Sequence, residues 1–246
     1  MKLYARFILA AVILAAAGLA ANAQISIQAG ASVSHQKMTQ HDPYDRDDRG
    51  GIGAYAGVDY DIHIIKGFHI TPGLYYNFTH ARHYQLGRYN LDERQADHQI
   101  NIPVYLKYSF NLKPNKLDLY LYAGPVLSVG MASELAAHID VSGFTYNLYI
   151  DNYSGAIRKL TLTNYNINEE REQALIDDFQ PELDNRGITQ RYIDLQIDGG
   201  IGFRFKDHWE LRFGYTFGVF DRFNRAYGDT HDLKMTQYYV GFGYRF

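Results

Sequence analysis

Apolar and polar residues alternate along most of the chain. In 25–33 the odd positions are apolar and the even positions are small or polar, which is the period-two pattern of a β-strand with one apolar face. The same alternation recurs in seven further segments, at 52–62, 68–78, 100–110, 119–131, 193–205, 209–219 and 238–246. Eight strands of about ten residues suit a closed barrel whose tilted strands cross a bilayer. The pattern predicts an all-β fold, an eight-stranded antiparallel up-and-down transmembrane β-barrel.

The connections between these segments alternate in length. Three are short turns and four are long and polar, the long ones spanning 36–49, 82–97, 133–190 and 221–235. Outer-membrane barrels have short periplasmic turns and long extracellular loops. Soluble eight-stranded barrels can also carry long loops, so the lengths of the connections alone do not exclude a soluble barrel.

The last predicted strand indicates a membrane barrel rather than a soluble one. Its apolar face is aromatic apart from one valine, and tyrosine suits the interface between acyl chains and headgroups. These residues resemble the C-terminal signal that barrel-assembly machinery recognises in outer-membrane proteins: Tyr238, Phe242, Tyr244 and Phe246. We therefore expect an integral protein of the cell outer membrane. Its expected partners are outer-membrane lipid and, during biogenesis, the barrel-assembly machinery.

The N-terminus predicts an exported protein. Lys2 and Arg6 precede an uncharged apolar run at 7–19, and small residues at 21–23 suit a signal peptidase. We predict a signal peptide over 1–23 and one barrel domain over 24–246. The apolar run is too short to span a bilayer comfortably, which takes about 20 residues.

Composition excludes several classes of protein. The absence of cysteine excludes a disulfide scaffold, a cysteine-ligated metal site and a cysteine nucleophile. A net charge of −3 gives no basic surface for nucleic acid, so no nucleic-acid partner is expected. A mean hydropathy of −0.33 is too polar for a helical membrane bundle, although it suits strands that are apolar on one face only.

Several segments resemble a known family. They are ITPGLYY at 70–76, INIPVYLKY at 100–108, LYAGPVL at 121–127, DGGIG at 198–202 and GYTFGVF at 214–220. Together they resemble the PorT-like outer-membrane β-barrel family typical of Bacteroidetes. The resemblance implies an eight-stranded barrel of the cell envelope, in a family that is defined by fold. One branch of that family is associated with type IX secretion and gliding, and no motif here assigns the chain to that branch.

Prolines interrupt the predicted strands. Pro72 lies near a strand start, whereas Pro103 and Pro125 fall in mid-strand, where a proline removes a ladder hydrogen bond. We predict β-bulges at Pro103 and Pro125, each able to shift the facing of later residues by one position.

The polar face of the strands is predicted to line the lumen. It carries a charge network of Asp59, Asp61, Lys107, Asp194, Asp198, Arg204, Glu210 and Arg212. Opposite charges in a narrow barrel should pair, because an unpaired buried charge costs several kcal/mol. We expect a lumen filled by ion pairs, without conduction. A gated narrow pore or a small-ligand site in the upper barrel is the alternative, whereas a wide porin needs more strands.

Histidines gather in the predicted loops and near the barrel rim, at His35, His41, His80, His83, His98, His138 and His231. Imidazole and carboxylate groups can hold a divalent metal. Apart from His80 and His83, no two of these histidines have the sequence spacing of metal ligands. We therefore expect solvated histidines with no metal and no cofactor. Ser109 and Ser128 lack a histidine or acidic partner in their own segments, and no Gly-x-Ser-x-Gly motif occurs, so we expect no enzyme activity.

The long connection at 133–190 is too long to be structureless in a compact protein. Alternation predicts a hairpin from 144–150 and 157–163, and Asn168 can cap a helix that ends by Pro181. This connection either covers the barrel mouth or binds a protein partner. We expect a non-enzymatic barrel with a structural or binding role through its loops. The alternatives are an accessory of a type IX-like secretion apparatus and a lipid-modifying outer-membrane enzyme.

Overall fold

The computed structural model describes residues 23–40, 47–85, 90–114, 116–141, 143–163, 165–186, 188–225 and 231–246. Apart from Ala23, the predicted signal peptide lies outside these residues.

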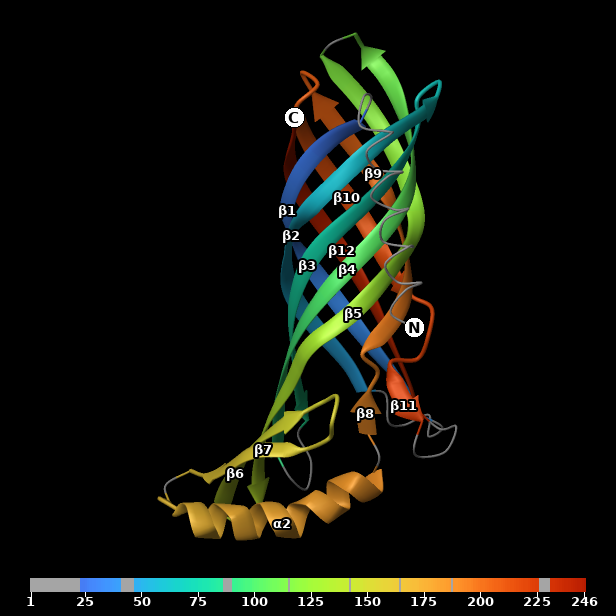
Figure 1. Cartoon of the computed structure of the whole chain (residues 1–246). Coiled ribbons are helices and arrows are strands. Elements are labelled where there is room, and N and C mark those ends of the chain that lie inside the picture. The colour runs from blue at the N-terminus through green and yellow to red at the C-terminus, as the bar shows by residue number, and fades with distance from the viewer. Residues whose placement is uncertain are drawn as a thin grey trace, which may run out of the picture.

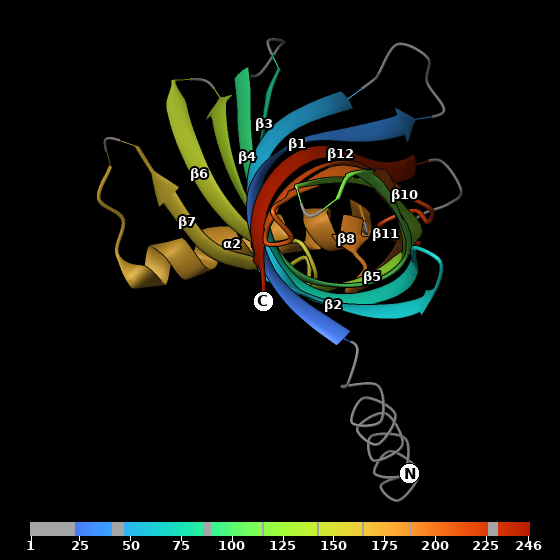
Figure 2. The same ribbon diagram turned by 90° about the horizontal axis from the view of Figure 1, so that it is seen from above.

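Eight antiparallel strands close into a barrel (Figures 1 and 2). They are β1 (Ala23–Gln40), β2 (Asp47–Ile65), β3 (Phe68–Gln85), β4 (Asn90–Lys113), β5 (Leu117–Val141), β9 (Ile193–Phe205), β10 (Trp209–Gly218) and β12 (His231–Arg245). The order around the sheet is β4-β3-β2-β1-β12-β10-β9-β5, and pairing of β4 with β5 completes the ring. The predicted fold is confirmed. We call the barrel end that carries the short turns the proximal end, and the opposite end the distal end.

The two faces of the barrel wall differ as the alternation predicts. On β1, the outward-facing Ile27 is 50% exposed whereas the adjacent Gln28 is 1% exposed. The same contrast holds on β12, where Phe242 faces outward and Gln237 faces inward. An apolar exterior around a polar interior is the reverse of a soluble barrel, so the soluble alternative does not fit.

The prolines do not introduce bulges, so that prediction is wrong. The register of β5 with β9 runs unbroken over 117–129, through Pro125. At Pro103 the pairing of β4 with β5 lapses and resumes at Leu106 in the same register, and a similar gap follows Pro72 in the pairing of β3 with β4. Each proline lacks one N–H and so removes a ladder bond, but the ladders on both sides keep the register without an inserted residue.

A bulge does occur on β5, at Met131. Gln99 pairs with Gly130 and His98 pairs with Ala132, so Met131 is an extra residue in the ladder. Odd-numbered residues of β5 face inward after this point, whereas even-numbered residues do so before it.

The strands at the distal end are longer than predicted. Most of the segments 36–49 and 82–97, expected as loops, belong to β1, β2, β3 and β4. Their ladders continue past the apolar exterior, as in the pairing of Arg82 with Arg94. Polar residues on both faces hid this continuation, because a strand with two solvated faces shows no alternation of hydropathy.

At the distal end the barrel sheet continues through β5 into two further strands, and a helix packs on them. They comprise β6 (Phe144–Asp151), β7 (Ile157–Leu162) and α2 (Glu169–Arg186), which together we call the distal module. β5 pairs with β9 up to Val129 and with β6 from Glu134 onward. Two short strands, β8 (Ile188–Gln190) and β11 (Phe223–Arg225), pair beside the mouth.

The distal module has its own apolar core. Ala137 of β5 packs with Leu148 and Leu160, and Ile176 and Phe179 of α2 lie against them. The predicted hairpin is confirmed, and Asn168 caps the helix by accepting a hydrogen bond from the amide of Arg171. In Figure 1 the helix runs across the distal end of the molecule, below β6 and β7.

The predicted end of this helix is wrong, because α2 continues past Pro181 to Arg186. A proline inside a helix removes one hydrogen bond. Packing of Ile176 and Phe179 on the sheet holds the preceding turns in place. Within the described residues, no helix is both long and apolar enough to cross a membrane.

Candidate functional site in the barrel lumen and at its mouth

Four charged side chains neutralise one another in the proximal half of the lumen. Lys107 Nζ lies 2.8 Å from an oxygen of Asp61, and Arg204 Nη2 lies 2.8 Å from Glu210 and 3.3 Å from Asp61. All four side chains are between 0 and 4% exposed. The ring of Tyr120 lies 4.3 Å from Lys107 Nζ, which adds a cation–π contact. Without these partners each buried charge would cost several kcal/mol, so the four residues depend on one another.

A second ion pair crosses the middle of the lumen. Arg212 Nη2 donates to Asp59 at 2.6 Å, and its Nη1 donates to the hydroxyl of Tyr75 at 3.2 Å. The guanidinium carbon lies 4.9 Å from the ring centre of Tyr122 and 5.7 Å from that of Tyr105. These rings and the carboxylate surround the cation and fill the cross-section beside it.

Asp198 and Asp194 also face the lumen. In the part of the chain that the structure describes, neither carboxylate forms an ion pair. The hydroxyls of Tyr105 and Tyr239 donate to Asp198 at 2.5 and 2.8 Å, and the amide of Gln196 donates to Asp194 at 3.1 Å. The predicted charge network therefore divides into two groups. Asp59, Asp61, Lys107, Arg204, Glu210 and Arg212 pair with opposite charges, and these two aspartates are held by neutral donors.

A small cavity lies distal to the middle ion pair. Its volume is about 40 Å³, and its lining includes Tyr55, Asn101, Asp198, Arg212 and Gln237. Such a volume suits roughly three water molecules. The hydroxyl of Tyr55 and the side-chain oxygen of Asn101 are buried with no hydrogen-bond partner among the described residues, so both can bond to water in this cavity.

The turn between β6 and β7 closes the mouth of the barrel. The amide of Asn152 donates to the hydroxyl of Ser133 at 2.8 Å, and that hydroxyl donates to Asp97 at 2.5 Å. Arg222 Nη1 lies 3.5 Å from Asp97, and the backbone N–H of Gln190 donates to the carbonyl of Asn152 at 2.7 Å. These contacts tie the distal module to β4, β5 and β8.

The turn itself is held by a carboxylate. Asp151 accepts hydrogen bonds from the amides of Tyr153 and Ser154 and pairs with Arg158. Burial raises the pKa of Asp151, but the Arg158 guanidinium and the two amides outweigh it and hold that pKa below its usual range. The ring of Tyr153 stacks on that of Tyr192 at 4.3 Å, and burial raises the pKa of Tyr153 to about 12.

The helix protects the free edge of the module sheet. The backbone N–H of Leu160 donates to the carboxylate of Glu172 at 3.1 Å, and that of Ile157 donates to the side chain of Gln180 at 2.9 Å. β7 is the last strand of the sheet, so these side chains satisfy amides that would otherwise face solvent or a second chain.

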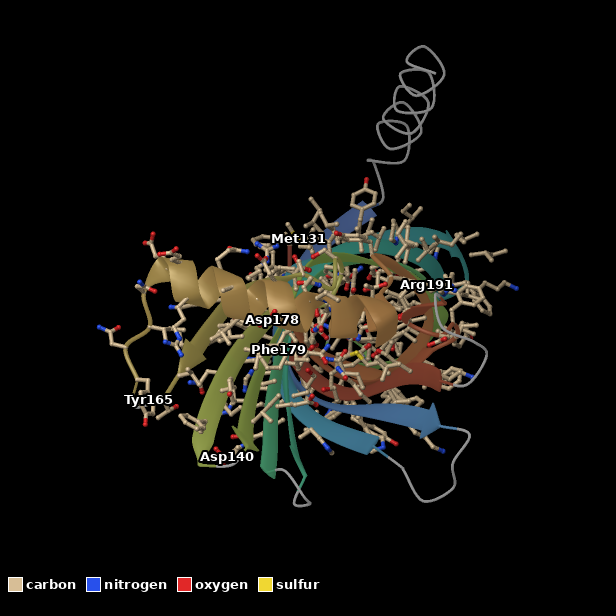
Figure 3. The ribbon with its side chains drawn as sticks, turned by 90° about the horizontal axis from the view of Figure 1, so that it is seen from below. Met131, Asp140, Tyr165, Asp178, Phe179 and Arg191 are labelled. Atoms are coloured by element: carbon tan, nitrogen blue, oxygen red, sulfur yellow. The ribbon has the colours of Figure 1, made fainter. Side chains whose placement is uncertain are left out.

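Figure 3 views this end from below, with the side chains drawn as sticks. α2 lies across the mouth with Asp178 and Phe179 in its middle, while Asp140 and Tyr165 lie toward the outer rim of the module and Arg191 lies on the opposite side. Glu169, Glu170, Asp177 and Asp178 are exposed on the helix, which makes its outer face acidic.

Candidate catalytic and metal-binding residues are scattered. Among the described residues, no three His, Asp or Glu side chains are grouped as metal ligands. His98 contacts the hydroxyl of Tyr76 at 2.5 Å, and His41 lies outside the described residues. The hydroxyl of Ser128 donates to Gln99 at 3.1 Å rather than to a base.

Comparison with known proteins agrees with this geometry. A family model, the outer membrane protein beta-barrel domain, matches residues 7–246. The chain belongs to this family. No curated protein matches the sequence.

Solved structures with a similar fold are outer-membrane barrels. Neisserial surface protein A is 13% identical, covering 92% of this chain and 99% of its own, with a TM-score of 0.38. Ail of Yersinia pestis, solved with a heparin analogue, is 12% identical to this chain. The match covers 92% of this chain and 99% of Ail, with a TM-score of 0.40. OprG of Pseudomonas aeruginosa is also 12% identical to this chain. The match covers 92% of this chain and 96% of OprG, with a TM-score of 0.40.

Membership of this family places the chain in the outer membrane as an integral protein. The proximal turns are periplasmic and the distal module is extracellular. The predicted assembly signal lies on the lipid-facing side of β12: Tyr238, Phe242 and Phe246 are exposed, and Tyr244 stacks on His208.

Sequence reasoning missed the distal pair of Asp97 and Arg222. Both fell in segments expected as loops. Asp97 lies two residues from each of the buried Gln95 and Gln99, so continuing the period-two count backward from residue 100 would have placed it in the lumen. No local pattern marks Arg222, because it enters the lumen from an irregular segment.

Proposed function

We propose that the protein is a non-conducting, non-enzymatic outer membrane barrel that serves the envelope as a structural or binding protein through its distal module. The filled lumen carries this proposal. Two ion-pair layers cross it, and the β6–β7 turn covers its mouth. A path for solutes would have to break buried pairs, whereas the module presents folded surface outside the membrane.

Conductance tests the first part of the proposal. The purified full chain in planar bilayers should give no steps of conductance, because Arg212 and Asp59 occupy the centre of the lumen. Steps of conductance in the unaltered protein would overturn the proposal.

Site-specific photocrosslinking tests the module as the binding surface. A photoreactive residue at Asp178, on the exposed face of α2, should capture an envelope partner in cells. The matched control is the same residue at Lys206, on a periplasmic turn. Equal capture from both positions, or capture from Lys206 alone, would contradict a role for the module.

The PorT-like resemblance supports one alternative, an accessory role in type IX-like secretion. The segments 70–76, 100–108 and 121–127 carry it. A deletion strain would then lose surface cargo while its barrier to detergents stayed intact. Under the structural or binding proposal, the surface cargo stays and the envelope phenotype changes.

The proposal includes no lipid-modifying activity. Ser128 bonds to an amide rather than to a base, and Ser133 donates to Asp97 and accepts from the amide of Asn152. The mass of lipid A should be the same in the deletion strain and its parent. A change in that mass, reversed by the complementing gene, would favour an enzyme.

A further inference from the structure

The apolar exterior of β3 marks the height of the membrane. Its outward-facing residues run from Phe68 to Phe78, and Leu74 and Tyr76 between them are exposed. At about 3.3 Å per residue this stretch is roughly 33 Å long. A tilt of about 40° reduces it to roughly 25 Å along the membrane normal, which matches the apolar band of outer-membrane barrels. Phe78 therefore lies at the extracellular edge of the hydrocarbon.

The same outward face becomes cationic just beyond that edge. His80 follows Phe78 on β3, and the next outward position is Arg82, which pairs in register with Arg94 of β4. Four residues beyond Phe78 correspond to about 13 Å along the strand, or roughly 10 Å along the normal. The headgroup layer extends about 5–8 Å beyond the hydrocarbon on each side, so a long arginine side chain at this height can reach its phosphates.

The side chains of Arg82 and Arg94 lie close together, although both are positively charged, because both bind the carboxylate of Asp92. Nε and Nη2 of Arg82 donate to the two oxygens of Asp92 at 2.9 Å, and Nη2 of Arg94 donates to the same carboxylate at 3.2 Å. Like charges directly opposite one another in a sheet are unfavourable unless anions lie between them. The arginine side chains remain 58% and 47% exposed, so solvent or a headgroup can reach both.

This surface faces the membrane side of the sheet. The core of the distal module lies on the opposite face, where Ala137 packs beneath α2, whereas Arg94 pairs in register with Ala136. In Figure 2 the distal ends of β1 to β4 spread outward from the ring of the barrel. Their outward face is therefore turned toward the lipid surface around the barrel.

We propose that Arg82 and Arg94 bind the phosphate of a phosphorylated lipid in the outer leaflet, whose acyl chains lie along Tyr76 and Phe78. Guanidinium groups bind phosphate through paired N–H donors and stay charged at any physiological pH. The surface is continuous with the lipid-facing exterior, so a membrane lipid can reach it without leaving the bilayer. The inference depends on the outer-membrane location and not on the role of the module.

Native mass spectrometry of the full chain, released from micelles with added lipid A or phosphatidylcholine, tests the proposal. The protein should retain lipid A in preference to phosphatidylcholine, and Arg82→Gln with Arg94→Gln should lower that retention by about tenfold. Arg171→Gln is the matched control, because Arg171 is an exposed arginine on α2. A heat-dependent shift in gel mobility verifies that each variant is folded.

Two results would overturn the proposal. One is equal retention of lipid A by the folded double variant and the unaltered protein. The other is displacement of lipid A by inorganic phosphate at an equal concentration, which would indicate a site for a free anion instead of a lipid. Reduced retention in the Arg171→Gln control as well would show a general charge effect and would also count against the site.

Discussion

The phenol of Tyr153 occupies the space that a side chain at Gly130 would need. Gly130 lies at the point where β5 turns away from β9 toward β6, and its amide donates to the carbonyl of Tyr192 at 2.7 Å. The absent side chain thus lets the β6–β7 turn lie against the barrel wall. A glycine at this position is therefore required for the close approach of Tyr153 to β5.

Gly130→Ala should unseat this turn. The methyl group would collide with the Tyr153 ring, and overpacking of this kind costs about 1–3 kcal/mol. We expect faster hydrogen exchange at 151–155 and faster proteolysis there, with the barrel still heat-modifiable. Gly50→Ala is the control, because nothing lies within 4 Å of a Cβ at that position. Unchanged exchange in Gly130→Ala would contradict this account of the mouth.

Arg212→Met should destabilise the barrel because it leaves Asp59 buried without its cation. Removal of one partner of a buried pair costs about 3–5 kcal/mol. Urea unfolding from lipid vesicles, followed by gel mobility, measures the change in the free energy of unfolding. Adding Asp59→Leu to the variant should recover much of the loss, because no charge is then left unpaired. If the double variant is no more stable than Arg212→Met alone, the ion pair is not the cause.

Glu172→Ala should expose the edge of β7. The amide of Leu160 loses its acceptor, at a cost of about 1 kcal/mol, and the edge becomes available to another chain. We expect faster exchange at Leu160 and more concentration-dependent association in micelles. Glu172→Gln retains an oxygen acceptor and should behave like the unaltered protein. If Gln and Ala at this position behave alike, the hydrogen bond is irrelevant to the edge.

Acid should loosen the β6–β7 turn. The pKa of Asp151 is lowered in the folded protein, so its contribution is present above the unfolded value of about 3.9 and is lost as the pH falls through the lower, folded value. The Arg158 partner is well exposed, so solvent screens this pair and the effect is small. Proteolysis of the turn should accelerate as the pH falls below about 4. Asp151→Asn should be looser at neutral pH and show no such transition.

Much of the barrel could be predicted from sequence because lipid outside and polar side chains inside impose one rule on every strand. Alternation alone placed Asp59 and Arg212 in the lumen. It could not say that they pair, because β2 and β10 are not neighbours in the sheet and their relative heights depend on the register of every strand between them.

Outside the membrane, strands no longer need an apolar outer face and a polar inner face. Asp97 and Arg82 lie on opposite faces of regular strands, yet both faces are polar there, so hydropathy carries no signal of the strand. The predicted effect of Pro125 failed for a related reason. A missing N–H is a local loss, whereas register is set by the whole ladder, and the bulge at Met131 follows a glycine instead of a proline.

β5 passes through both the barrel wall and the sheet of the distal module, with β4 beside it from Leu117 to Asp140. The hydrogen bonds of this ladder lie across the strands. A pull on the module away from the cell therefore loads the ladder in shear, so that many bonds resist together instead of opening one at a time. A load on the module would therefore reach the barrel wall through one continuous ladder.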